Sequence, residues 1–229
     1  MIFHDVIQNT DEWFALRAGN VGGSSIGKIM ANMKPIAKSV PSCIIHIGKD
    51  QYDYTRPFGD PAKQLAVKLA IEQITGKTKE GESFSNSHME RGHEQEPIAR
   101  AMYEREYFCT VTNGGFFDGE DGCGVSPDGM VSDNGMVEIK SVIDHVQYST
   151  VKRDSYDPKY KWQLVLNMKV TGREWIDYVS FSAEFPEGKR LYVKRIWAKD
   201  CKDLFLLVDL RLNEYWKLLA ETKKIIEAV

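Results

Sequence analysis

The sequence lacks several features that would place it in a specialised class of protein. Its four cysteines are scattered without a C-x-x-C pair, which argues against a zinc or iron–sulfur site and fits reduced thiols in a cytoplasm. The longest purely apolar run covers only residues 204–208, far too short to span a bilayer. The first residues show no basic or apolar segment typical of a signal peptide. We therefore expect a cytoplasmic protein without a membrane partner.

An excess of charge of either sign is also missing. The formal net charge is −3 over 229 residues, of which 28% are charged and 42% hydrophobic. This balance gives no global attraction to nucleic acid, so any nucleic-acid-binding surface must be local. A chain of this length buries one substantial core, and no internal repeat or low-complexity tract divides it. We expect a single domain over residues 1–229.

Hydrophobic periodicity and turn signals predict helices and strands in a mixed order. Thr10 or Asn9 is expected to cap the first helix, and Asp60 the third. The order indicates an α/β protein with a mixed central β-sheet flanked by helices. The expected helices are 11–18, 23–32, 60–76, 87–105, 144–153, 158–171 and 200–228, and the expected strands are 107–112, 115–118, 123–126, 129–132, 136–141, 174–183 and 190–197.

The stretch SPDGMVSDNGMVEIKS, residues 126–141, carries the charged residues that most clearly indicate a site. Its Asn-Gly dipeptide is a strong tight-turn signal, which folds strand 136–141 back beside 129–132. The turn lets Asp128 and Glu138 approach one another, while Glu138 and Lys140 share one face of their strand. On its own, an E-x-K sequence usually forms an exposed Glu–Lys ion pair, here beside a turn aspartate, with no functional role. The proline, the aspartate and the hairpin spacing favour a site.

Cleavage of a phosphodiester with a divalent cation needs oxygen ligands around the scissile phosphate and a cation for the developing charge. Two clustered carboxylates repel each other, and a bound divalent ion is the usual compensation. Asp128, Glu138 and the backbone carbonyl of Ile139 are therefore candidate metal ligands. Lys140 is placed to position an attacking water or to stabilise the transition state.

Asp128 followed after nine residues by Glu138-Ile139-Lys140 resembles the PD-(D/E)xK nuclease core, and the fuller pattern is similar to the lambda-exonuclease, or YqaJ-like viral recombinase, family. The match runs from about residue 11 to 171 in the right order. Asn167 stands where related RecB-type nucleases have a tyrosine, which disfavours that branch. The remaining matching residues are Trp13, Leu16, Arg17, Gly19 and Ser24, then Gly92, Glu96 and Arg100, then Ser126, Pro127 and Gly129, and finally Tyr160 and Gln163.

The resemblance implies a role for each matching residue. Asp128, Glu138 and the Ile139 carbonyl would bind Mg²⁺ or Mn²⁺, as two ions per site, with Lys140 catalytic. Glu96 would reach the same cluster from its helix. The residues implied to bind DNA or its phosphates are Arg17, Ser24, Ser126, Tyr160 and Gln163.

The family also implies an activity and partners. The expected enzyme is a 5′-to-3′ exodeoxyribonuclease that digests linear double-stranded DNA from its ends. It would leave 3′ single-stranded overhangs for recombination by single-strand annealing. The same expectation includes a homotrimeric ring, a single-strand-annealing protein as partner, and a location in the host cytoplasm for a protein that is bacterial or phage-encoded.

Other functions remain open at this stage. One is a PD-(D/E)xK endonuclease of the restriction or junction-cleaving kind, and another is a non-catalytic module that binds DNA ends. Residues 22–28 nearly match a phosphate-binding P-loop, but Ile29 stands where a hydroxyl should meet magnesium, which disfavours an NTPase.

Two basic segments are candidates for contact with DNA, because basic residues interleaved with aromatic ones suit backbone binding and base stacking. A solvated loop is the alternative for the first of them. The first segment contains Lys34, Lys38, Lys49, Arg56 and Lys63 among Tyr52, Tyr54 and Phe58, and the second contains Lys189, Arg190, Lys194 and Arg195.

Overall fold

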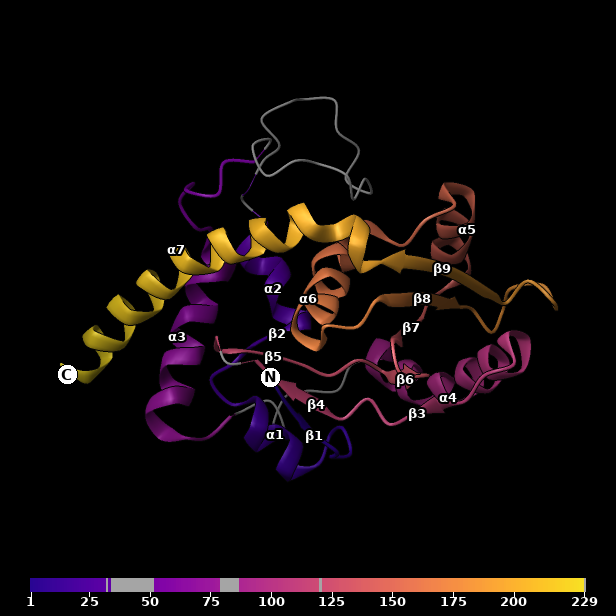
Figure 1. Cartoon of the computed structure of the whole chain (residues 1–229), viewed down its shortest axis with the longest axis horizontal. Coiled ribbons are helices and arrows are strands. Elements are labelled where there is room, and N and C mark those ends of the chain that lie inside the picture. The colour runs from indigo at the N-terminus through magenta and orange to yellow at the C-terminus, as the bar shows by residue number, and fades with distance from the viewer. Residues whose placement is uncertain (32, 34–51, 79–86, 120, 229) are drawn as a thin grey trace.

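The computed structural model describes residues 1–31, 33, 52–78, 87–119 and 121–228, without the side chains of 87–90. In these residues the strands form two sheets (Figure 1). The five-stranded sheet has the order β3 (Val111–Thr112), β6 (Gly129–Val131), β7 (Gly135–Ser141), β8 (Trp175–Phe181) and β9 (Leu191–Trp197). The four-stranded sheet has the order β1 (Ile2–His4), β4 (Phe116–Asp118), β5 (Cys123–Val125) and β2 (Val21–Gly22).

The central strand β7 has a different relation to each of its neighbours. It pairs antiparallel with β6, with Gly129 opposite Val137 and Val131 opposite Gly135. The predicted hairpin is therefore confirmed, but its turn covers residues 132–134, with Ser132 at positive φ, and Gly135 already belongs to β7. On its other side β7 runs parallel to β8, and β9 is antiparallel to β8. The larger sheet is therefore mixed, as the sequence predicts.

Helices cover both faces of this sheet (Figure 1). One face packs on α6 (Lys161–Thr171), and the same core continues into α2 (Gly23–Met30), α3 (Asp60–Thr75) and α7 (Lys202–Glu227). The other face packs on α4 (Ser87–Tyr107) through a separate cluster of buried residues. Alternation along β7 produces this division, because Met136 belongs to the first core and Val137 and Ile139 to the second.

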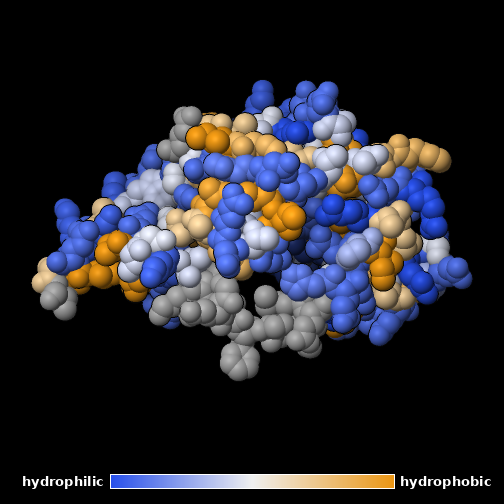
Figure 2. Space-filling view, turned by 90° about the horizontal axis from the view of Figure 1, so that it is seen from below, coloured by the Kyte–Doolittle hydropathy of each residue, from blue (hydrophilic) through white to orange (hydrophobic). Residues whose placement is uncertain are grey.

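Two further helices complete the described part of the fold. The first, α1 (Asp11–Arg17), contributes Trp13 to a small core with Val6 and Phe116 of the four-stranded sheet. The second, α5 (Asp144–Arg153), follows β7 and buries Gln147, which donates to the carbonyl of Ser180 on β8. On the face in Figure 2 hydrophilic residues predominate, and hydrophobic ones gather in separate patches. No helix of the described residues has the length and hydropathy needed to cross a bilayer.

Several predicted boundaries need correction. Thr10 does cap α1, but the N-cap of α3 is Gly59, and Asp60 is already helical. The strand predicted over 107–112 is wrong in its first half, because α4 runs to Tyr107. The Cys109 amide then donates to the Glu104 carbonyl at 3.1 Å and closes the helix end.

Other differences concern short elements. A 3-10 turn over Pro158–Tyr160 precedes α6, where one helix over 158–171 was predicted, and another over Ala198–Cys201 precedes α7. The strands β1 and β2 were not predicted. They are three and two residues long, so their sequences are too short to display alternation, and only their pairing with β4 and β5 defines them.

The aromatic residues of the first basic segment are not arranged for base stacking. Tyr52 is buried and Phe58 packs against the main core. Arg211, on α7, is fully buried, lies 3.7 Å from the Phe58 ring, and donates to the carbonyls of Tyr54, Arg56 and Ile29. Arg211 thereby fixes residues 54–58 to the protein interior, and the Tyr52 ring packs against Trp162, so the stacking hypothesis for these rings is wrong. Lys34, Lys38 and Lys49 lie outside the described residues.

The second basic segment is also engaged within the fold. On β9, Lys194 pairs with Asp154 at 3.2 Å, and Arg195 makes a bidentate pair with the buried Asp177. The Arg195 guanidinium also stacks 3.7 Å from the Trp175 ring. These contacts stabilise the sheet edge, and they weaken the hypothesis of a DNA path along it.

Candidate active site

A cavity of about 700 Å³ opens where β7, α2, α4 and α6 converge. Every residue predicted for the site contributes to its lining, although these residues come from distant parts of the sequence. They are Arg17, Ser24, Glu96, Ser126, Asp128, Glu138, Ile139, Lys140, Tyr160 and Gln163.

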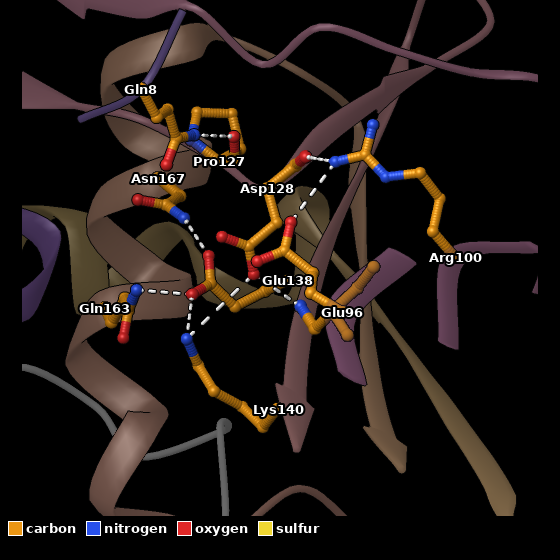
Figure 3. Close-up of polar contacts among 10 residues, drawn as sticks. Gln8, Glu96, Arg100, Pro127, Asp128, Glu138, Lys140, Gln163 and Asn167 are labelled. Carbon is orange, nitrogen blue, oxygen red and sulfur yellow. Dashed lines mark hydrogen bonds and ion pairs between the residues drawn. The ribbon is translucent and has the colours of Figure 1, made fainter. Parts of the chain in front are cut away.

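Glu138 lies at the centre of the site and is only 1% exposed. Its Oε1 accepts hydrogen bonds from the Lys140 ammonium and the Gln163 amide, and its Oε2 accepts one from Asn167 Nδ2 at 2.9 Å (Figure 3). A buried carboxylate is tolerated only when such donors replace its lost water. Strand β7 and helix α6 therefore hold this group jointly.

Asp128 enters the cluster from the residue just before β6. Its Oδ2 accepts the Ile139 amide at 2.6 Å and lies 4.0 Å from Lys140 Nζ. In a β-strand the N–H and C=O of one residue point to the same side. The Ile139 carbonyl therefore faces the edge of β7 where Asp128 stands, as the predicted ligand set requires.

Glu96 approaches from the opposite side of the sheet, on α4. Arg100, one turn further along the same helix, lies 3.3 Å from Glu96 Oε1 and also donates to the backbone carbonyl of Asp128 at 2.5 Å (Figure 3). Arg100 thus links the position of Glu96 to the turn that carries Asp128. The predicted convergence of Glu96 with the two other acids is found in the structure.

The electrostatics of the cluster follow from burial and from like charges at short range. Burial, and next the Asp128 charge, raise the pKa of Glu138 to about 7, against the opposing effect of Lys140. Burial and Asp128 likewise raise the pKa of Glu96. Burial alone would lower the pKa of Lys140, but Glu138 and Asp128 together raise it above its usual value. A nearby positive charge would therefore stabilise the ionised forms of Glu138 and Glu96, and Lys140 stays protonated.

This arrangement fits a hard divalent cation. No three carboxylate, imidazole or thiol groups of the described residues come together tightly enough to ligate an ion by themselves. An ion at this position would need Asp128, Glu138, the Ile139 carbonyl and water. Magnesium suits such a site, because it binds through one or two carboxylates and keeps several waters.

A second group of polar residues lines the cavity beside α1 and α2. The Arg17 guanidinium stacks 4.1 Å from the Trp13 ring, and Trp13 Nε1 donates to Ser126 Oγ at 2.7 Å. Ser24 lies in the first turn of α2, whose N-terminal amides carry partial positive charge. An arginine, two hydroxyls and a helix N-terminus together suit an anion such as phosphate.

Tyr160 and Gln163 line the same cavity close to Lys140 and Glu138. The Gln163 amide donates to Glu138 Oε1 and so belongs to the polar network of the site. The Tyr160 ring lies 5.1 Å from Lys140 Nζ and 5.9 Å from the Tyr178 ring. Tyr160 therefore packs against the lysine while it lines the cavity.

Sequence reasoning missed the role of Asn167, which it noted only as a replacement for a tyrosine. The signal was present, because Asn167 follows Gln163 by four residues and shares its face of α6. It also missed Gln8, whose amide donates to the Pro127 carbonyl at 2.9 Å and fixes the turn before Asp128. Nothing in the local sequence around Gln8 indicates that contact.

The P-loop alternative is not supported by the structure. Residues 22–28 do lie at the start of a helix, but Ile29 is fully buried.

Two acids and a lysine at a mixed sheet, with Asp128 just before β6 and Glu138-Ile139-Lys140 on the adjacent strand β7, define a nuclease fold with a PD-(D/E)xK core. The family model of the YqaJ-like viral recombinase domain matches residues 12–174, and the chain belongs to that family. Comparison with curated proteins found no match.

Solved structures agree with this assignment. An alkaline exonuclease (LHK-Exo) from Laribacter hongkongensis is 30% identical, with a TM-score of 0.72 over 96% of this chain and 95% of that one. LHK-Exo in complex with dAMP matches equally well. A phage-related exonuclease from Haemophilus somnus 129PT is 18% identical, with a TM-score of 0.61 over 92% and 96% of the two chains, and shares the fold. The family relation supports nuclease activity, that is, phosphodiester hydrolysis.

Proposed function

We propose that the protein is a Mg²⁺- or Mn²⁺-dependent exodeoxyribonuclease that digests linear double-stranded DNA from its 5′ ends and leaves 3′ overhangs for single-strand annealing. The observation that carries the proposal is the joining of two sites in one cavity. A cluster suited to cleavage, around Glu138, lies beside a pocket suited to phosphate, around Arg17. A pocket for a terminal phosphate next to the scissile bond favours attack from an end.

Each residue of the cleavage cluster around Glu138 would have a distinct role in hydrolysis. Asp128, Glu138 and the Ile139 carbonyl would hold the ions, which neutralise charge that develops on the phosphate. Lys140 is kept protonated by the two acids, so it acts as a hydrogen-bond donor to water or to the phosphate rather than as a general base. Glu96, held by Arg100, would orient water beside the same ions.

The phosphate pocket would select the end of the DNA. Arg17 would contact a 5′ phosphate through its planar fork, with Ser24 and Ser126 as neutral donors. Trp13 holds both Arg17 and Ser126 in place. The pocket and the cleavage cluster share Gln163 as a neighbour, so the end phosphate and the scissile phosphate would lie on one path along α6.

A ring of three subunits is part of the proposal. With a net charge of −3, a monomer has little long-range attraction to DNA. A closed ring would keep the enzyme on its substrate by topology, and cyclic symmetry would require a heterologous contact between subunits. A single-strand-annealing protein would then receive the 3′ overhang.

Incubation with linear and with closed circular plasmid, each with and without Mg²⁺, tests the proposal. We expect release of nucleotides from linear DNA only, and only with the ion. Asp128→Ala and Lys140→Ala should each abolish release while the fold persists, and only the former should weaken Mg²⁺ binding. Nicking of the circle would instead indicate an endonuclease. Retention of DNA ends without any hydrolysis would indicate a non-catalytic end-binding module.

A further inference from the structure

Asn167 occupies an unusual position for a polar side chain. It is 1% exposed, and its amide nitrogen donates to Glu138 Oε2 at 2.9 Å. Gln163, one helical turn earlier on α6, donates to the other oxygen of the same carboxylate. Two amides on one helix face therefore hold the two oxygens of Glu138 separately, and they fix the orientation of the carboxylate (Figure 3).

The far side of the Asn167 amide is set by α2. Because the nitrogen faces Glu138, the oxygen Oδ1 faces Gly23, the first residue of that helix. A methyl group at Gly23 would lie 2.9 Å from Asn167 Oδ1 and 3.2 Å from Gln163 Cγ. Such contacts are too short for an unshifted side chain, so only glycine leaves both amides in their present place.

The two contacts of Asn167 join the two halves of the cavity. Gly23 precedes Ser24 in the phosphate pocket, and Glu138 belongs to the cleavage cluster. From this geometry we infer that Asn167, held in place by Gly23, is a positioning residue that orients Glu138 for the divalent ion. The inference rests on the proposed function and assigns to it a residue pair outside the predicted site.

The chemistry of the alternatives explains why an amide is needed at position 167. Alanine would leave Glu138 Oε2 without its donor, and the carboxylate could rotate away from its present plane. Aspartate would place a carboxylate oxygen against the buried Glu138 Oε2, and two acceptors at this distance repel each other. Loss of a hydrogen-bond partner behind a metal ligand typically weakens metal binding about 10- to 100-fold.

The test compares Asn167→Ala and Gly23→Ala with the matched control Gly27→Ala. Gly27 lies on the same helix as Gly23, but nothing stands within 4 Å of a methyl group added there. Each protein is assayed for the Mg²⁺ concentration that gives half-maximal nucleotide release, for kcat and KM, and for binding of 5′-phosphorylated DNA ends in EDTA. Mg²⁺ binding is also followed by the shift of Tm, a readout that does not depend on turnover.

We expect Asn167→Ala and Gly23→Ala to raise the half-maximal Mg²⁺ concentration by about tenfold or more and to lower kcat. For Asn167→Ala, binding of DNA ends without the ion should stay within about twofold of wild type, and Gly27→Ala should match wild type in every assay. Native Mg²⁺ dependence in Asn167→Ala would overturn the inference while leaving the nuclease assignment intact. An equal loss of ion-free DNA binding would reassign Asn167 to general packing, and a wild-type protein without Mg²⁺-dependent release would overturn both proposals.

Asn167→Asp provides a second route to the same answer if the alanine variants unfold. The substitution keeps the shape of the side chain, so it changes the interaction with Glu138 and little else. A folded Asn167→Asp protein with native Mg²⁺ affinity would also refute the positioning role.

Discussion

The raised pKa of Glu138 makes Mg²⁺ binding depend on pH in a direction that the structure fixes. Burial and Asp128 raise that pKa from 4.5 to about 7 in the ion-free protein. At about pH 6 most Glu138 is therefore protonated, and an ion must displace the proton before it binds. At about pH 8 the carboxylate is already ionised.

The size of the effect follows from the fraction of ionised carboxylate. That fraction rises about tenfold between pH 6 and pH 8 for a group with a pKa near 7, so the apparent Kd for Mg²⁺ falls about tenfold. At saturating Mg²⁺ this difference adds about 1.4 kcal/mol to the stabilisation by the ion. For a chain of this size the gain in Tm should be about 3–6 °C larger at the higher pH.

Without the ion, the stability of the folded protein changes with pH in the opposite direction. The folded protein holds a proton on Glu138 in a range of pH where the unfolded chain has lost it, so this group makes stability fall as pH rises from 4.5 towards 7. Thermal unfolding with and without Mg²⁺ at both pH values measures the two effects together. Mg²⁺ should therefore restore at alkaline pH a stability that the ion-free protein loses.

Two variants make the measurement specific. Glu138→Gln should abolish the difference in the Mg²⁺-induced Tm shift between the two pH values. Glu72→Gln removes a different buried carboxylate, which lies outside this cavity and accepts a hydrogen bond from the Gly19 amide at 3.0 Å. This variant should keep the wild-type difference in Tm shift between the two pH values. An Mg²⁺-induced shift of Tm that is equal at both pH values in the wild-type protein would refute the reasoning.

Three further outcomes are expected. Arg17→Ala should slow digestion of 5′-phosphorylated ends more than of 5′-hydroxyl ends, because the fork–phosphate contact exists only in the former; equal losses in a comparison of initial rates would reassign Arg17 to general binding. Arg211→Met should lower the free energy of unfolding by about 2–4 kcal/mol in urea titrations, since three backbone carbonyls lose a charged donor; native stability would contradict this role. Light scattering should give three times the 26.1 kDa chain mass, with digestion that resists excess competitor DNA; a monomer that switches to the competitor would remove the ring.

The sequence alone determined most of the secondary structure and the identity of the central cluster. The turn-rich residues 132–135 predict the β6–β7 hairpin, and alternation along β7 separates Glu138 and Lys140 from Val137 and Ile139. Both signals are local, because turn geometry and strand periodicity depend on neighbouring residues. The order of the family motifs then added Glu96, Arg17 and Gln163, which local patterns do not connect with Asp128.

Only the tertiary structure decided what depends on contacts between distant segments. The two short strands β1 and β2 exist through pairing with β4 and β5. Phe58 packs on the core where Arg211 of α7 contacts its ring, and Tyr52 is buried beside Trp162 of α6. Asn167 faces Glu138 because α6 packs on the face of the sheet that carries Glu138, and Gly23 permits that approach because α2 meets α6 there. The sequence indicates residues that can do chemistry, whereas long-range packing decides which of them meet, since residues far apart in the chain can be neighbours in the fold.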